Sequence, residues 1–151
     1  MRIQLDQNLE KDCYRLAESE DFLWLLLNNR YFLWMIIVPN TTQTEIYRLT
    51  GQDQQKLTLQ SNIISEFITQ HFDCDKLNVA SIGNIVAQMH LHIIARTTKD
   101  PCWPGVVWGT EIKAPYPLDD VLKIQTKLQR FCQDKKITGY HFSALEIKTI
   151  Q

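Results

Sequence analysis

Two apolar runs separated by three polar residues constrain the fold of this chain more than any other feature. Residues Phe22 to Leu27 read FLWLLL, and residues Tyr31 to Val38 read YFLWMIIV and are followed by proline. Asn28 to Arg30 lies between the runs, and asparagine tolerates the left-handed conformations that tight turns need. The pattern predicts two antiparallel central strands. Their continuous apolarity predicts that helices cover one face and further protein, such as a second subunit, covers the other.

Three other segments have the apolar spacing of amphipathic helices. A helix over about 53–72 follows a start signal at Thr50, a second spans 118–134, and a weaker pattern predicts a short helix over 9–18. A capping box at Thr42 to Glu45 predicts one more short helix. The residues expected on the buried face of the long helix are Leu59, Ile63, Ile64, Phe67, Ile68 and Phe72.

Two further strands are expected, one at 77–81 and one at 88–96. The segment 140–150 fits either an edge strand or a docking tail. A chain of 151 residues buries roughly 70% of its unfolded surface, which suits a single domain over residues 1–151. The pattern as a whole predicts an α+β fold: a mainly antiparallel sheet of about five strands with helices packed on one side.

Charge and cysteine content exclude several functional classes. The formal net charge of −1 gives no general attraction to nucleic acid or to an anionic membrane. No apolar run approaches the roughly 20 residues of a membrane-spanning helix. The four cysteines are widely spaced and form no metal or redox pair. With no secretory signal at the N-terminus, we expect reduced thiols in a cytoplasmic protein.

The strand expected at 88–96 reads QMHLHIIAR and carries the most informative polar residues. By strand alternation, Met89, Leu91 and Ile93 face the core, and His90 and His92 share the other face. Their backbones lie roughly 7 Å apart at strand spacing. The two imidazoles can therefore lean together around one small ligand, such as a phosphate group or a metal ion.

Three interpretations of this pair stay open. Both histidines could lie on the wet face of an ordinary strand. A metal site would need a third ligand, and neither His71 nor His141 sits in a metal-binding frame. The third interpretation is a nucleophilic histidine that acts at phosphorus, since neutral imidazole is a competent nucleophile and a partner on one ring nitrogen fixes the tautomer.

The order of motifs around the pair favours the third interpretation. A strand reading KLNVA precedes the turn Gly83-Asn84, then QMHLHII follows, and WPG comes shortly after. This order resembles the histidine triad superfamily of nucleotidyl hydrolases and transferases. It is most similar to the bacterial diadenosine tetraphosphate hydrolase-like subgroup, in which glutamine replaces the first histidine. The resemblance extends from about Phe22 to Trp108.

The resemblance implies an activity, a partner and a set of site residues. It implies that His90 attacks the α-phosphorus of a nucleotide, forms a nucleotidyl-histidine intermediate and releases it to water, with no cofactor or metal required. His92 would stabilise the phosphate or the leaving group. The resemblance also implies a homodimer. The positions that match binding residues of the family are Asn78, Gly83 and Asn84 on the phosphate side, Asn28 near the ribose, and Trp103 in the loop near the site.

Three positions depart from the family pattern. Gln88 replaces the first histidine and cannot titrate near neutral pH. Leu33-Trp34 occupies the place of a helper histidine, and Ile85 that of a frequent serine. The departures keep a second hypothesis open, in which the pocket binds a purine nucleotide without appreciable turnover.

Overall fold

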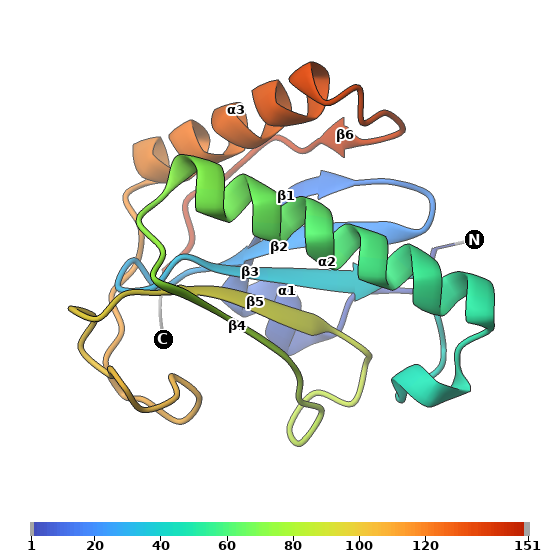
Figure 1. The fold of residues 1–151 in the computed structure, drawn as a ribbon, viewed down its shortest axis with the longest axis horizontal. Coiled ribbons are helices and arrows are strands. Elements are labelled where there is room, and N and C mark those ends of the chain that lie inside the picture. Colours follow the sequence, from blue (N-terminus) through green and yellow to red (C-terminus); the bar gives the residue numbers. More distant parts are fainter. Residues whose placement is uncertain (1, 150–151) are drawn as a thin grey trace.

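The computed structural model describes residues 2–149 and has the predicted α+β architecture (Figure 1). One open antiparallel sheet has the strand order β4-β5-β3-β2-β1-β6. The strands are β1 (Cys13–Glu18), β2 (Phe22–Leu27), β3 (Trp34–Pro39), β4 (Lys76–Ser81), β5 (Leu91–Arg96) and β6 (His141–Phe142). The helices are α1 (Gln7–Asp12), α2 (Gly51–His71) and α3 (Leu118–Asp134), with a 3-10 turn, η1 (Ile46–Arg48).

The two apolar runs form the central hairpin that the sequence predicts. Strand β2 pairs with β3 in a register that sets Leu26 opposite Met35 and Phe22 opposite Pro39. All six residues of β3 are buried, and so are five of the six in β2. Strand β5 then pairs with the other edge of β3, so the histidine-bearing strand lies beside the centre of the sheet.

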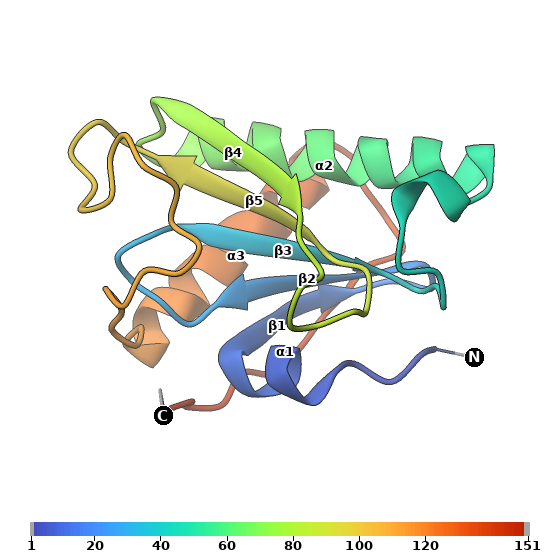
Figure 2. The same cartoon turned by 90° about the horizontal axis from the view of Figure 1, so that it is seen from below.

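The sheet separates two apolar layers. Helices α2 and α3 cover one face, where Trp24, Met35 and Ile37 are fully buried. The opposite face is covered by α1 and by the loop that follows β5, over a second cluster that includes Leu25 and Ile36. Figure 2 shows this second face, with α1 in front of β1 and the loop after β5 beside the strands. Both faces of the hairpin are therefore covered within one chain.

The helix expected over 9–18 is wrong in its second half. Helix α1 ends at Asp12, and residues 13–18 form β1, which pairs with β2. The apolar positions at Leu9, Cys13 and Leu16 fit helical spacing, but the exposed edge of β2 offers a full ladder of backbone hydrogen bonds. Tertiary pairing therefore overrides a weak local pattern.

Two details around α2 also differ from expectation. The capping box at Thr42 to Glu45 does not form, and the short turn η1 has no side-chain cap. The start signal at Thr50 is confirmed, since its hydroxyl accepts a hydrogen bond from the Asp53 amide at 3.1 Å. Leu59 is 56% exposed, whereas Gln60 is buried. The buried face includes Gln60 because its Oε1 accepts hydrogen bonds from the Trp24 indole and the Tyr140 hydroxyl.

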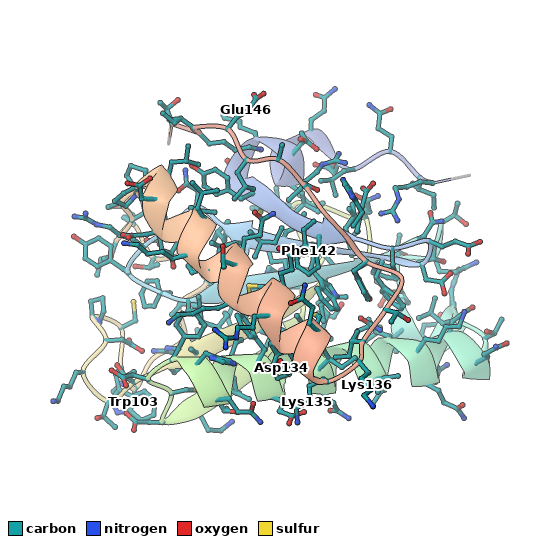
Figure 3. The ribbon with its side chains drawn as sticks, turned by 90° about the horizontal axis from the view of Figure 1, so that it is seen from above. Trp103, Asp134, Lys135, Lys136, Phe142 and Glu146 are labelled. Atoms are coloured by element: carbon teal, nitrogen blue, oxygen red, sulfur yellow. The ribbon has the colours of Figure 1, made fainter. Side chains whose placement is uncertain are left out.

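The C-terminal segment is both an edge strand and a docked tail. Strand β6 pairs with β1, and the chain then continues along the sheet past Glu146, as Figure 3 shows. The Lys148 amide donates to the Tyr14 hydroxyl at 3.1 Å. Ile150, the last residue of the expected segment, lies outside the described residues. Within residues 2–149, no helix is both long and apolar enough to cross a membrane.

Candidate active site

His92 lies at the start of β5 and His90 just before the strand, both on the face opposite α2 and α3. The strand begins at Leu91, so the expected strand at 88–96 is three residues too long at its start. Met89, Leu91 and Ile93 join the core beneath the helices, as the alternation predicts. The His90 and His92 rings lie 4.7 Å apart, centroid to centroid, at an angle of 74°. Both side chains are buried, so the pair is not on a wet face.

His92 is held by a tryptophan from the neighbouring strand. The Trp34 indole nitrogen donates a hydrogen bond to His92 Nδ1 at 2.8 Å. An indole nitrogen can only donate, so Nδ1 accepts and a neutral His92 carries its hydrogen on Nε2. Burial, followed by the charge of His90, lowers the pKa of His92 from 6.5 to about 4. At neutral pH, His92 is therefore an uncharged Nε2–H donor.

His90 is held in the opposite tautomer. Its Nδ1 lies 2.7 Å from the backbone carbonyl oxygen of Gln88. A carbonyl oxygen can only accept, so Nδ1 carries the hydrogen and the Nε2 lone pair of a neutral His90 is free. The strand therefore presents a ring nitrogen that can attack beside a ring nitrogen that can donate. This combination suits attack on a phosphorus whose oxygens gain negative charge.

A small cavity opens beside the pair. It measures about 220 Å³, and its wall includes Trp34 and Trp108. Trp108 packs edge-on against both His92 and Trp34, with ring centroids 5.6 Å and 5.8 Å apart. Neither histidine lines the cavity itself, so the two indoles connect it to the reactive pair. The rest of the wall is Lys11, Asp12, Leu27, Asn28, Asn29, Val107, Gly109, Thr110, Lys113 and Thr149.

A larger hollow lies elsewhere on the molecule. It measures about 490 Å³, and its wall includes Phe72, Ala95 and Lys127. Phe72 packs against the apolar layer beneath the helices, on the face opposite the histidines. The cavity beside Trp34 and Trp108 is therefore the better candidate for a ligand that reaches His90.

Comparisons with known proteins agree with this geometry. The model of the HIT domain, the histidine triad domain, matches residues 8–99. The chain belongs to the histidine triad family. A histidine triad protein from Marinobacter aquaeolei VT8 is 38% identical, with a TM-score of 0.82 over 89% of this chain and 98% of that chain. No curated protein matches the chain.

Two other histidine triad proteins of known structure are similar to this chain. The protein from Sinorhizobium meliloti 1021 is 33% identical, with a TM-score of 0.80 over 84% of this chain and 95% of that chain. The protein blr8122 from Bradyrhizobium japonicum is 30% identical, with a TM-score of 0.82 over 86% of this chain and 98% of that chain. The similarity therefore extends over nearly the whole of each relative.

Gln88, two residues before His90, binds the N-terminal segment. Its Oε1 accepts from the Asp6 amide at 2.8 Å, and its Nε2 donates to the Gln4 carbonyl at 3.1 Å. Both ends of the amide are thus bonded to main chain. Through its own backbone carbonyl, the same residue orients His90.

The predicted phosphate-side residues of this histidine triad protein separate into two groups. Asn78, on β4, points its Oδ1 toward Arg96 and accepts a hydrogen bond from it at 2.9 Å. Gly83 and Asn84 are exposed in the loop that leads to His90. A methyl group added at Gly83 would make ordinary contacts, 3.6 Å from the nearest atom, so its backbone does not require glycine.

The side chains of Asn28 and Trp103 both contact other parts of the chain. Asn28 lines the cavity, but its Oδ1 accepts from the Tyr116 amide at 2.8 Å and its Nδ2 donates to the Lys148 carbonyl at 3.2 Å. Trp103 packs against the Arg96 guanidinium, at 5.7 Å, near the far end of β5. The loop does approach His92, but through Trp108.

Sequence analysis missed Trp34, Trp108 and Arg96 as parts of the site. In the sequence, Trp34 stands out only as a departure from the family pattern. In the sheet it pairs with Ile94 and so lies diagonally across from His92. Correct strand register would have revealed it. Across residues 2–149, no three His, Cys, Asp or Glu side chains are grouped closely enough to hold a metal ion.

Proposed function

We propose that this protein is a nucleotidyl hydrolase or transferase that cleaves a (di)nucleoside phosphate at its α-phosphorus, with His90 as nucleophile. The opposite tautomers of His90 and His92 are the main support for this proposal. His90 Nε2 forms a bond to phosphorus as the bond to the leaving group breaks. Water then attacks the same phosphorus, the N–P bond breaks, and a nucleoside monophosphate leaves.

The state of His92 favours one class of leaving group. With a pKa of about 4, His92 is neutral at pH 7 and donates a hydrogen bond without transferring its proton. A phosphate or nucleotide leaves as an anion and needs only that hydrogen bond, whereas an amine must be protonated as it leaves. We therefore expect a dinucleoside polyphosphate to react faster than a nucleoside phosphoramidate. Neither step requires a cofactor.

The small cavity supplies a site for the nucleoside. Trp34 and Trp108 offer aromatic surface next to His92, and Lys11 and Lys113 add positive charge to the wall. A nucleoside seated against the indoles would direct its α-phosphate toward His90.

We also propose that the chain acts as a homodimer in the cytoplasm. Strand β4 is an edge strand whose outer side is unpaired in the described chain. Val79 on that strand and Ile85 in the loop after it are 48% and 92% exposed. Mass measurement by light scattering tests the assembly, and a monomer at working concentration would contradict it.

The deciding experiment compares wild type with His90→Ala, and uses His141→Ala as a control because His141 is exposed on β6. Each protein is mixed with a diadenosine polyphosphate or an adenosine phosphoramidate and quenched in alkaline denaturant. We expect His90→Ala to lose at least ~10³-fold in nucleotide release, because the residual rate comes from binding groups alone. A covalent nucleotide should appear on wild type and on His141→Ala.

A binding protein without turnover is the second candidate, and the bonds of Gln88 favour it. Each end of that side chain already bonds the N-terminal main chain, at the Asp6 amide and the Gln4 carbonyl, so the amide is held away from a role as a mobile phosphate ligand. A nucleotide that raises the melting temperature but is never cleaved by wild type would select this candidate.

A further inference from the structure

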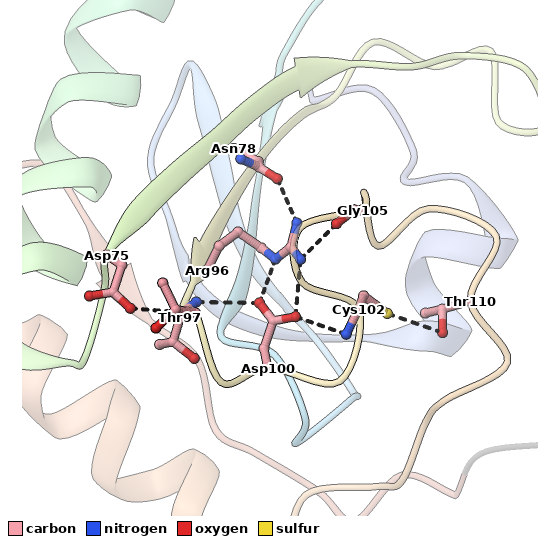
Figure 4. Close-up of polar contacts among 9 residues, drawn as sticks. Asp75, Asn78, Arg96, Thr97, Asp100, Cys102, Gly105 and Thr110 are labelled. Atoms are coloured by element: carbon pink, nitrogen blue, oxygen red, sulfur yellow. Dashed lines mark hydrogen bonds and ion pairs between the residues drawn. The ribbon is translucent and has the colours of Figure 1, made fainter.

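The last residue of the histidine strand is a fully buried arginine. Arg96 is 1% exposed and lies on the same face as His92, four positions along β5. Its side chain meets acceptors in three places, as Figure 4 shows. Asp100 is bonded at 2.7 Å and 3.0 Å, the Gly105 carbonyl at 2.8 Å, and Asn78 at 2.9 Å. A buried guanidinium with this many partners is fixed in position.

Most of these partners belong to the loop over 97–110. Asp100 uses its remaining capacity to accept from the backbone amides of Thr97 at 3.3 Å and Cys102 at 2.9 Å. Asp75, just before β4, accepts from the Thr98 amide at 2.8 Å (Figure 4). The first half of the loop is therefore folded around the ion pair between Arg96 and Asp100.

The second half of the loop reaches the site. Val107 is fully buried in the apolar layer on the histidine face of the sheet. The next residue, Trp108, packs against His92 and Trp34. The Cys102 thiol donates to the Thr110 hydroxyl at 3.5 Å, which joins the two halves. The position of the Trp108 ring thus depends on how the loop is anchored at Arg96.

We propose that Arg96 is a positioning residue for the active site, which acts by holding the loop over 97–110 so that Trp108 covers His92. The indole then keeps water from the imidazole and forms part of the cavity wall. The effect on catalysis rests on the function proposed above, but the effect on His92 does not. If the Arg96–Asp100 ion pair merely stabilised the fold, its loss would leave the pKa of His92 unchanged.

The surroundings of His92 make its titration a suitable readout. Among the described residues, the titratable group that packs against His92 is His90. The other aromatic rings that pack against His92 are those of Trp34 from β3 and Trp108 from the loop, and neither carries a titratable proton. Ala80 lies opposite it on β4. A change in solvent access through Trp108 therefore appears directly as a change in the pKa of His92.

The test uses Arg96→Lys, which keeps the charge but loses the planar fork. We expect the pKa of His92, measured by NMR, to rise from about 4 toward 6.5, and the Trp108 indole resonance to shift. Loss of kcat/KM should be roughly 10- to 100-fold, as for a misplaced catalytic group. The double variant with Trp108→Ala should be no slower than Trp108→Ala alone, because both changes remove the same contact.

The control is Phe131→Leu on α3, which lowers stability from the opposite face of the sheet. It should leave the His92 titration unchanged. An unchanged titration in Arg96→Lys, or additive effects with Trp108→Ala, would overturn the proposal. Should Arg96→Lys not fold, Asn78→Ala removes one of the four bonds and is measured in the same way. If wild type cleaves no nucleotide, the proposed function fails, and the NMR readouts still decide the role of Arg96.

Discussion

Replacement of Trp34 by phenylalanine tests the hydrogen bond that fixes His92. The phenyl ring keeps most of the apolar contact but removes the hydrogen that His92 Nδ1 accepts at 2.8 Å. His92 is 7% exposed, so water cannot freely replace this donor. A buried acceptor without a partner costs about 1–3 kcal/mol, and the smaller ring adds about 1 kcal/mol. We expect the free energy of unfolding to fall by about 2–4 kcal/mol.

The same change should alter where His92 carries its hydrogen. Without the indole donor, the proton can move to Nδ1, and Nε2 then becomes an acceptor that repels phosphate oxygens. Nitrogen NMR of histidine-labelled protein at pH 7 distinguishes the two tautomers, and urea unfolding gives the stability. Trp24→Phe is the matched control, since its indole is also buried and donates to Gln60 at 3.1 Å, on the opposite face. It should lose less stability, because Gln60 keeps the Tyr140 hydroxyl as a donor, and it should leave His92 as it is. A Trp34→Phe variant that keeps the Nε2–H form would refute the reasoning.

Three further predictions concern stability. The pKa of His92 is lower in the folded chain than in the unfolded chain, so the unfolded chain binds a proton first as the pH falls. The free energy of unfolding should therefore fall by at most about 3 kcal/mol between pH 6.5 and pH 4. Urea unfolding across this range should show that His92→Gln lacks this component. Thr50→Ala should cost about 1 kcal/mol through loss of the helix cap, and thermal unfolding should show no loss for Thr42→Ala, where no cap forms. Gln60→Leu should lower the free energy of unfolding by about 2–4 kcal/mol, because the buried Trp24 indole and the half-buried Tyr140 hydroxyl lose their acceptor. Leu59→Ala should change the denaturation midpoint little, because Leu59 is exposed.

The parts of the fold that could be predicted are those with strong local patterns. The central hairpin, helix α2 and the two faces of β5 all follow from apolar periodicity over six or more residues. Strand β1 could not be predicted in this way, because what makes residues 13–18 a strand is the free edge of β2, which lies several residues later in the chain. Where a short pattern fits both a helix and a strand, the structure depends on whether a neighbouring strand is available to pair with it. A single sequence does not show which strands pair.

The residues of the candidate site likewise differ in how far a local sequence pattern predicts their position. His90 and His92 are two residues apart around the start of β5, so alternation alone places them together. Trp34 reaches His92 through strand register, and Trp108 through a loop anchored at Arg96. The spacing of nearby residues indicates neither relation. The WPG motif marks Trp103, which packs against Arg96, whereas Trp108 packs against His92.

The origin of the cavity wall has a consequence for how this protein can diversify. Apart from Trp34 on β3, the wall comes from α1, from the end of β2 and the turn after it, from the loop over 107–113 and from the tail at Thr149, whereas the histidine pair is fixed at the start of an inner strand. Loops and terminal segments accept insertions and substitutions more readily than inner strands do. Selection can therefore change the molecule that this cavity recognises while the two imidazoles stay in place.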